Sequence, residues 1–349
     1  MNPAFSISRR NFSAGSVLAG AALGCPRLSA QVKPEKTKVV IAVNGKAAFC
    51  YLPLTLAEQL GYFKAEGLNV EIRDFSSEAS ALHEAVNGPV DVYSSDFERT
   101  INLQSQNQFF QAFVLQTRAP QVAFGVSTKN LPNYQTVSDL KGKKIGVSSL
   151  GSSTNMLASL VLSRGGLKSS DVSFISVLTS TDAVSALRSG QIDAVSHSDP
   201  ALTMLEQRGD VKIIKDTRTL KGTIEVFGGA MPGACLYSSI EFINKAPSTC
   251  QALTDAIVRS LKWLQTAGPG DILKTVPESY LLGDRALYLS SFNKVRESIS
   301  LDGMISEDGP RTAFKALTSF DANIKLERIN LPKTYTNEFV RRAKERFKV

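Results

Sequence analysis

The sequence predicts an α/β protein built from two lobes, and three observations point to this class. Its 349 residues exceed the usual size of one domain and suffice for two lobes, each with its own core. Hydrophobic residues make up 43% and charged residues 21% of the chain, which excludes disorder, collagen and coiled coil. Short apolar runs alternate with stretches of helical period, a pattern typical of strands and crossover helices on a mostly parallel sheet.

The first predicted strand, residues 38–43, is an apolar run without polar alternation, which suits a strand covered on both faces. Helical periods separate it from the later strands. Those strands are predicted at residues 69–75, 91–94, 109–116, 121–127, 144–148, 172–177, 193–196, 211–214 and 233–237. Beyond Pro247 the pattern becomes almost purely helical, with main segments at residues 248–266, 284–299, 310–323 and 337–348.

One short unit recurs in the two halves of the chain. Residues 88–96 (GPVDVYSSD) follow a predicted helix at 78–86, and residues 190–199 (GQIDAVSHSD) follow one at 181–189. Each unit has a glycine turn, a short strand led by Asp, a polar strand end and a second Asp. Because ligands of open α/β sheets bind beyond the carboxyl ends of strands, the two units indicate a cleft between the lobes.

The first thirty residues have the pattern of an export signal. Arg9 and Arg10 form a twin-arginine pair before an apolar run at residues 14–24, shorter than the roughly 20 residues of a membrane-spanning helix. Small residues end the segment at Ala30, so we expect twin-arginine export and a periplasmic mature protein. A second interpretation stays open, in which cleavage before Cys25 leaves a lipid-anchored protein.

The net charge of +8 is a modest basic excess, and a nucleic-acid partner would require that excess to be concentrated in one patch or stripe. Removal of residues 1–30 takes away three arginines and no acid, which leaves +5. The densest basic window, residues 341–348, contains its own acid and is typical of the solvated face of a terminal helix. The only membrane contact we expect is therefore the lipid at Cys25, if that cleavage occurs.

Catalytic motifs are missing from the sequence. The chain has two histidines, His83 and His197, and lacks HExxH, G-x-S-x-G and a phosphate-binding loop. We therefore expect no catalytic residue, metal or other cofactor. Of the four cysteines, removal of residues 1–30 would leave Cys50, Cys235 and Cys250, an odd number at irregular spacing, so no disulfide framework follows, although a single bridge between Cys235 and Cys250 stays open.

Polar residues at strand ends are the candidate ligand contacts. Ser152, Ser153 and Thr154 follow the strand at 144–148 and open a helix, where hydroxyls and free N–H groups suit an anionic ligand group. Ordinary helix capping explains the same residues equally well. His197 stands at the strand end of the second repeated unit, where it would line the cleft.

Two aspartates and one arginine complete the candidates from the residues alone. Asp96 and Asp199 stand at helix starts, where capping and a role in the cleft remain alternatives. If their carboxylates face the cleft, the ligand should carry a cationic or hydroxylated group. Arg118, just beyond the strand at 109–116, would supply the opposite charge.

Three motifs, in order and at the expected spacing, resemble those of one family of periplasmic solute-binding proteins. They are YLPLTLAEQLGYFKAEGLNVE (residues 51–71), DLKGKKIGV (139–147) with the following Gly-Ser-Ser-Thr stretch, and GQIDA (190–194). From about residue 38 to about 265 the chain resembles the binding proteins for nitrate, taurine and alkanesulfonates. That group includes the yeast-type thiamine-pyrimidine synthase.

This resemblance implies a type II periplasmic-binding-protein fold, in which the chain crosses twice between lobes that close on a ligand. The crossings would fall near residues 126–129 and 223–228. The expected division is an export signal at 1–30, a first lobe at 37–126 and 229–349 with the C-terminal helices, and a second lobe at 127–228.

The resemblance also implies a function. We expect a monomeric receptor that delivers a small polar or anionic solute to the permease and ATPase of an ABC importer, without catalysis. The ligand contacts carried over from the family are Ala48, Phe49, Tyr51, Ser94, Ser95, Asp96, Ser152, Ser153, Thr154, His197 and Asp199. An aromatic residue usual beside the proline of the last loop is replaced by His197-Ser198-Asp199, which leaves the ligand's identity open.

Two alternative functions remain within the same fold. One is an enzyme like the pyrimidine synthase, which in that relative depends on a cysteine-rich iron motif and pyridoxal phosphate. This sequence has no clustered cysteines. The other is a ligand sensor that takes no part in transport.

Overall fold

The structure is a computed structural model of the chain and describes residues 33–75, 84 and 88–349. Residues 33–349 form one unit. The predicted export signal, with Cys25, lies outside the described residues. The predicted helix at 78–86 also lies outside them, except for Glu84.

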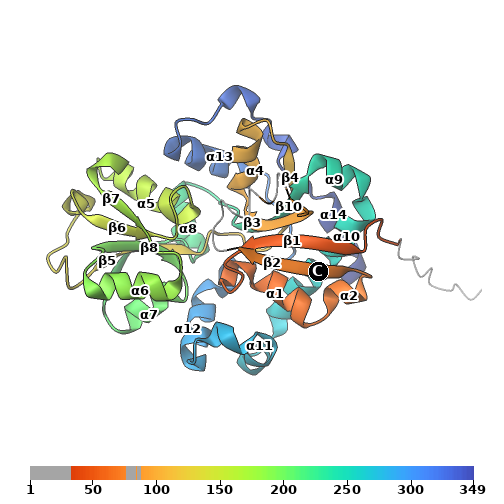
Figure 1. Cartoon of the computed structure of the whole chain (residues 1–349), viewed down its shortest axis with the longest axis horizontal. Coiled ribbons are helices and arrows are strands. Elements are labelled where there is room, and N and C mark those ends of the chain that lie inside the picture. The colour runs from red at the N-terminus through yellow and green to blue at the C-terminus, as the bar shows by residue number, and fades with distance from the viewer. Residues whose placement is uncertain (1–32, 76–83, 85–87) are drawn as a thin grey trace, which may run out of the picture. The chain divides into compact units, whose positions relative to one another are not determined.

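In the described part of the chain, ten strands form two five-stranded sheets (Figure 1). The first sheet has the order β2-β1-β3-β10-β4, with β1 (Lys38–Asn44), β2 (Asn69–Phe75), β3 (Val92–Asp96), β4 (Phe110–Leu115) and β10 (Ala234–Ser239). The second has the order β7-β6-β8-β5-β9, with β5 (Val122–Ser127), β6 (Lys144–Val147), β7 (Ser173–Ser176), β8 (Ala194–Ser198) and β9 (Val211–Asp216). The predicted α/β class is confirmed.

Pairing within the two sheets follows one plan. β1 runs parallel to β2 and β3, and β6 runs parallel to β7 and β8. A single antiparallel strand then follows in each sheet, β10 beside β3 and β5 beside β8. Because the parallel strands carry their connections on the sheet faces, helices must cover both faces.

The helices occupy these connections and the C-terminal third of the chain. They are α1 (Leu52–Gln59), α2 (Tyr62–Ala65), α4 (Glu98–Ser105), α5 (Ser153–Arg164), α6 (Ser180–Ser189), α7 (Ala201–Gln207), α8 (Leu220–Phe227), α9 (Ile240–Lys245), α10 (Pro247–Thr266), α11 (Pro269–Thr275), α12 (Arg285–Val295), α13 (Gly309–Phe320) and α14 (Glu338–Phe347). Two short 3-10 helices matter below, η1 (Phe49–Tyr51) and η4 (Glu278–Leu281).

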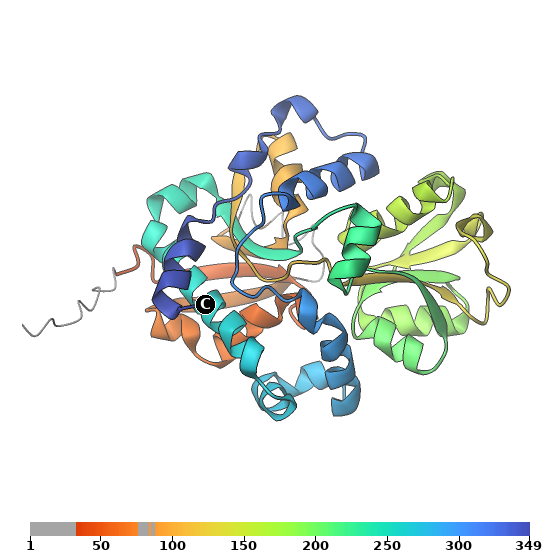
Figure 2. The same ribbon diagram turned by 180° about the vertical axis from the view of Figure 1, so that it is seen from behind.

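Alternate residues of a strand point to opposite faces of its sheet and pack in separate hydrophobic cores. In the second sheet, Phe124 packs in the cluster that contains α5, whereas its neighbour Ala123 packs with α6 and α7. In the first sheet, Ile41 packs with α1, α10 and α12, whereas Ala42 packs with α4 and α13. In the rear view of Figure 2, the cyan-to-blue C-terminal segments surround the first sheet.

The chain passes between the two sheets twice, as expected. It leaves through residues 116–121, between β4 and β5, and returns through residues 217–233, between β9 and β10. The first crossing lies before the expected position at 126–129, because the whole of β5 hydrogen-bonds with β8 and β9 of the second sheet. The expected boundary at residue 126 therefore needs correction, while the rest of the predicted division stays a prediction.

The three cysteines of the described chain are free. Cys235 packs in the core on one face of the first sheet and Cys250 in the core on the other. The bridge that the sequence left open between them is therefore not formed. No helix among the described residues is both long enough and apolar enough to cross a membrane.

Candidate ligand site

A cavity of about 320 Å³ lies between the two sheets and takes its walls from both. It is lined at the carboxyl ends of β1, β3, β6 and β8 and at the starts of α5 and α6. Ser279, Tyr280 and Leu282, from η4 and the residue after it, complete the wall. Its size is at the lower end of the range of about 300–1,000 Å³ for small-molecule sites.

Most of the predicted contacts lie together in this cavity. Those that line it are Ala48, Tyr51, Ser95, Asp96, Ser152, Ser153, Thr154, His197 and Asp199. They come from both sheets, as the two repeated strand ends predicted. Whether they bind a ligand stays a prediction.

Three predicted contacts do not line the cavity. Phe49 points into the core, where its ring centroid lies 4.8 Å from that of Tyr288. Ser94 is fully buried and accepts a 2.8 Å hydrogen bond from a glutamine amide. The Arg118 guanidinium donates two hydrogen bonds, of 2.9 and 3.1 Å, to the backbone carbonyl of Glu297, so it serves the packing of the crossing segment.

Further parts of the wall were missed by the sequence analysis, among them the start of α6 and Tyr280. Thr179 to Thr181 form the start of α6. The sequence pattern that could have indicated them is a capping box that follows a strand. Thr179 Oγ1 accepts from the amide of Asp182, and the Asp182 carboxylate accepts from the amide of Thr179, each at 3.1 Å. No sequence pattern indicates that Tyr280 lines the cavity, because only tertiary packing brings it close to strand ends that lie far away in the sequence.

The start of α5 combines capping with the cavity wall. Ser152 Oγ accepts a 3.3 Å hydrogen bond from the amide of Asn155, which caps the helix. Thr154 Oγ1 lies 2.7 Å from Ser152 Oγ and accepts a 2.9 Å bond from the amide of Ser148. Ser153 instead lies beside Asp96 of the first sheet, close enough for its hydroxyl to lower the pKa of that carboxyl, so it stands where the two walls meet.

Asp96 is the acidic group of the first wall. Burial raises the pKa of its carboxyl, against the opposing effects of the neighbouring Ser153 side chain and of the nearby Arg99 charge. Burial, with the Asp96 charge, also raises the pKa of the Cys50 thiol in the same wall. That thiol therefore stays protonated at neutral pH.

His197 is buried with both ring nitrogens beside backbone oxygens. Nδ1 lies 3.2 Å from the carbonyl of Ser198, and Nε2 lies 3.2 Å from the carbonyl of Val177. Burial lowers the pKa of the ring, which favours the neutral form with one N–H. These partners hold the side chain in the wall.

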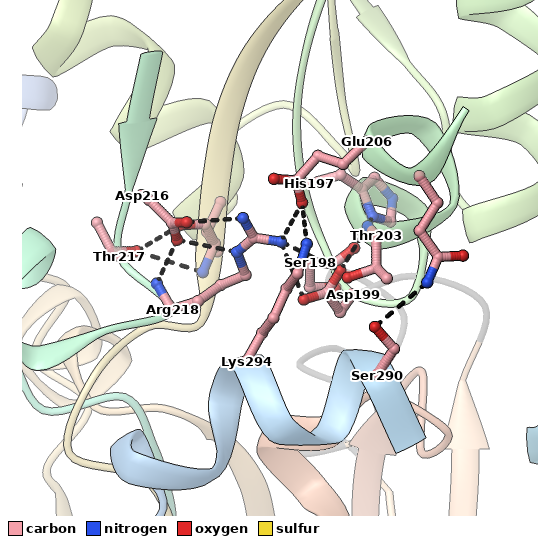
Figure 3. A network of polar contacts seen from close by, with 12 residues as sticks. His197, Ser198, Asp199, Thr203, Glu206, Asp216, Thr217, Arg218, Ser290 and Lys294 are labelled. Carbon is pink, nitrogen blue, oxygen red and sulfur yellow. Dashed lines mark hydrogen bonds and ion pairs between the residues drawn. The ribbon is translucent and has the colours of Figure 1, made fainter. Parts of the chain in front are cut away.

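Asp199 belongs to a buried ionic cluster centred on Arg218 (Figure 3). Nη1 of Arg218 lies 3.2 Å from Asp199 and 2.8 Å from Glu206, and Nη2 lies 2.6 Å from Asp216. Asp199 also accepts a 2.8 Å bond from the amide of Thr203 in the first turn of α7, although the N-cap residue of that helix is Pro200 and not Asp199 as the capping interpretation required. Burial raises the pKa of Asp199, although the charge of Arg218 opposes that rise.

The cavity offers neutral donors rather than cations. None of the described residues that line it is Lys or Arg, and the sequence at 76–83 and 85–87 contains neither. Among the described residues, no group of three or more His, Cys, Asp or Glu is arranged to hold a metal ion. An anionic group would therefore meet hydroxyls and the N–H groups at the starts of α5 and α6.

Two α/β lobes joined by two crossings, with a cavity at the strand ends of both sheets, define the periplasmic-binding-protein fold. The family model described as "NMT1/THI5 like" matches residues 49–267, and the chain belongs to this family.

Similar solved structures agree with this fold. A protein from Bordetella bronchiseptica RB50 is 53% identical, with 91% of this chain and 100% of that chain covered and a TM-score of 0.87. The alkanesulfonate-binding protein SsuA from Xanthomonas axonopodis pv. citri, bound to MOPS, is 17% identical over 87% of this chain and 99% of that one (TM-score 0.65). The desulfurization enzyme DSZB is 15% identical over 89% and 100%, respectively (TM-score 0.63). The last two show the fold alone.

Proposed function

We propose that this protein is the solute-binding receptor of an ABC importer. It captures a small polar or anionic organic solute, of the sulfonate, nitrate or pyrimidine-like class, by hinge closure. The observation that carries the proposal is the cavity between the two sheets, lined from both lobes by the polar ends of strands and helices. The alkanesulfonate-binding neighbour, which shares the fold and holds a sulfonate buffer, supports the same class.

Recognition in this cavity would use hydrogen bonds rather than ion pairs. The start of α5 presents Ser153, and the start of α6 presents Thr179 and Thr181. A hydrogen bond to a charged ligand group contributes about 1.5–3 kcal/mol, and a partly buried helix start adds up to about 2 kcal/mol. Several such contacts bind an anion firmly without a lysine or arginine.

Binding is favoured over catalysis by the state of the reactive groups in the wall. DSZB is an enzyme with this fold, so the fold alone does not decide the question. The thiol of Cys50, with its raised pKa, is a poor nucleophile. Both nitrogens of His197 face carbonyl oxygens, so the ring is not free to act as a base toward that thiol.

The proposal includes export and partners. The receptor acts as a monomer and passes its ligand to a membrane permease with its ATPase, after twin-arginine export. A reporter fused to residues 1–35 should reach the periplasm, and Arg9→Lys with Arg10→Lys should abolish that export. Palmitate labelling that is lost in Cys25→Ala would establish the lipid-anchored form, whereas continued export of the double variant would rule out the twin-arginine route.

A ligand screen tests the receptor function itself. The protein is unfolded, dialysed and refolded to remove any bound solute, and its melting temperature is measured with inorganic anions, sulfonates, pyrimidines and aromatic acids. A ligand at a hundred times its Kd stabilises the fold by about 2.7 kcal/mol, which gives a clear shift. The true ligand should also reduce the radius of gyration. A screen in which no compound changes either quantity contradicts the proposal.

A further inference from the structure

We propose that the ion pair between Lys294 and Glu206 is an interlobe latch, which sets the balance between the open and closed forms of the cleft. Arg218 connects this latch to the wall of the cavity. The inference rests on the hinge closure of the proposed function, and it assigns that motion to particular side chains.

The two helices that carry the latch belong to different lobes. α12 is anchored in the core of the first sheet, where Tyr288 and Phe292 place their rings 4.8 and 6.4 Å from that of Phe49. α7 is anchored in a core of the second sheet through Leu202 and Leu205. A contact between α7 and α12 therefore closes the molecule across the two lobes.

Two polar contacts join these helices side by side (Figure 3). Lys294 Nζ lies 2.6 Å from a carboxylate oxygen of Glu206. About one helical turn away, Gln207 Nε2 donates a 3.2 Å hydrogen bond to Ser290 Oγ. The Lys294 and Glu206 side chains keep 34% and 25% of their surface exposed, so water and salt reach the pair. Such a contact can open without exposing an apolar core.

The opposite flank of the cleft is built differently. There, Met156 and Leu160 of α5 pack in one apolar cluster with Ala313 and Leu317 of α13. Separating that flank would expose buried hydrocarbon, at about 25 cal/mol for each Å². Opening the polar flank between α7 and α12 therefore costs less free energy. A reversible latch is expected on that flank.

Arg218 ties the latch to the ligand cavity. Its Nη1 lies 2.8 Å from the same Glu206 oxygen that Lys294 contacts, and 3.2 Å from Asp199 in the cavity wall. The Arg218 side chain is 2% exposed, so it cannot move independently of these partners. A solute that displaces the wall at Asp199 therefore displaces Glu206 as well. Arg218 is a positioning residue, since it does not line the cavity.

Small-angle scattering of the refolded, unliganded full chain tests the latch. Lys294→Gln should increase the ratio of open to closed molecules about fivefold, equivalent to ~1 kcal/mol. Lys294→Arg should restore the wild-type ratio. The matched control is Lys344→Gln, which removes a 2.5 Å pair with Asp302 of nearly equal exposure, 33% and 28%, within the segment packed on the first sheet. The control should leave the radius of gyration unchanged.

Salt supplies a second readout. At 1 M salt the screening length falls to about 3 Å, so the wild type should open as salt increases, whereas Lys294→Gln should respond little. Equal scattering of Lys294→Gln and the wild type would overturn the latch, and so would equal opening in Lys344→Gln. These measurements need no ligand. A failed ligand screen with a functioning latch therefore rejects the receptor and leaves the latch standing.

Discussion

Each of the two sheets contains one copy of the repeated unit, and the second aspartate of the unit has a different environment in each sheet. β3 and β8 each hold the middle position of a five-stranded sheet, and each leads to an aspartate in the cavity wall. Asp199, after β8, is 2% exposed and compensated by Arg218. Asp96, at the end of β3, lines the cavity beside Ser153, and the charge of Arg99 acts on it without a direct ion pair like that between Arg218 and Asp199. From this difference we predict that Asp199 serves structure, whereas Asp96 meets the ligand.

The beginning of the unit is the same in both sheets. Asp91 accepts a 2.9 Å hydrogen bond from the amide of Val40 in β1, and Asp193 accepts a 3.0 Å bond from the amide of Lys144 in β6. Each first aspartate thus ties its strand to the neighbouring parallel strand. The first part of the predicted repeat therefore has the same structure in both sheets. The second part, which reaches the cavity, differs between them.

The largest effect is expected where the compensation of Asp199 is removed. Arg218→Gln leaves two buried or half-buried carboxylates, Asp199 and Asp216, without their cation. Breaking a buried pair from one side costs about 3–5 kcal/mol, which urea unfolding would measure. Arg342→Gln is the control, because its 3.1 Å pair with Glu338 is exposed and contributes about 1 kcal/mol or less. Similar small losses in both variants would show that Asp199 needs no compensation.

A smaller effect, on affinity rather than stability, is expected from Ser153→Ala. The Ser153 hydroxyl lies between the two walls, whereas Ser152 and Thr154 are occupied by capping and by each other. Affinity for the compound found in the thermal-shift screen should fall about tenfold, or ~1.4 kcal/mol, as measured by calorimetry. The free energy of unfolding should change by less than about 1 kcal/mol.

Ser248→Ala is the matched control for Ser153→Ala. Ser248 also lies in the first turn of a helix, α10, and its side chain also lowers the pKa of a neighbouring carboxyl, that of Glu35, outside the cavity. Its replacement should leave affinity unchanged. If Ser153→Ala lowers only stability, the start of α5 is a cap and the two walls do not share a ligand.

The sequence predicted the strands well because apolar runs and turn residues are local signals. Contacts within the cavity were harder. In η1, successive residues turn by about a third of a circle, so Ala48 and Tyr51 line the cavity while Phe49 points into the core. Arg218 lies in the return crossing and reaches Asp199, a residue of the wall, only through tertiary packing. Such placement depends on tertiary structure, which no local pattern encodes.

The smallest expected effect, and the one that sharpens the comparison most, is the pH response of Asp96→Asn. Burial raises the pKa of Asp96 above its ordinary value of 3.8, so the folded protein binds this proton more tightly than the unfolded chain. The resulting stability is complete below pH 3.8 and is lost as pH rises through the raised pKa. The amide that replaces the carboxyl does not titrate, so the variant should gain melting temperature relative to wild type across that interval, and the gain should then level off.

Asp139→Asn provides a control of opposite sign for this experiment. The amides of Thr136 and Gln135 donate to the Asp139 carboxylate and lower its pKa, so its contribution is present above pH 3.8 and is lost as pH falls. The difference in melting temperature between Asp139→Asn and wild type should therefore shrink toward acid pH. The difference for Asp96→Asn should vanish there as well. At neutral pH the two differences must have opposite signs. If Asp96→Asn instead destabilises the protein at neutral pH, Asp96 is compensated like Asp199, and the first wall offers no free carboxylate to a ligand.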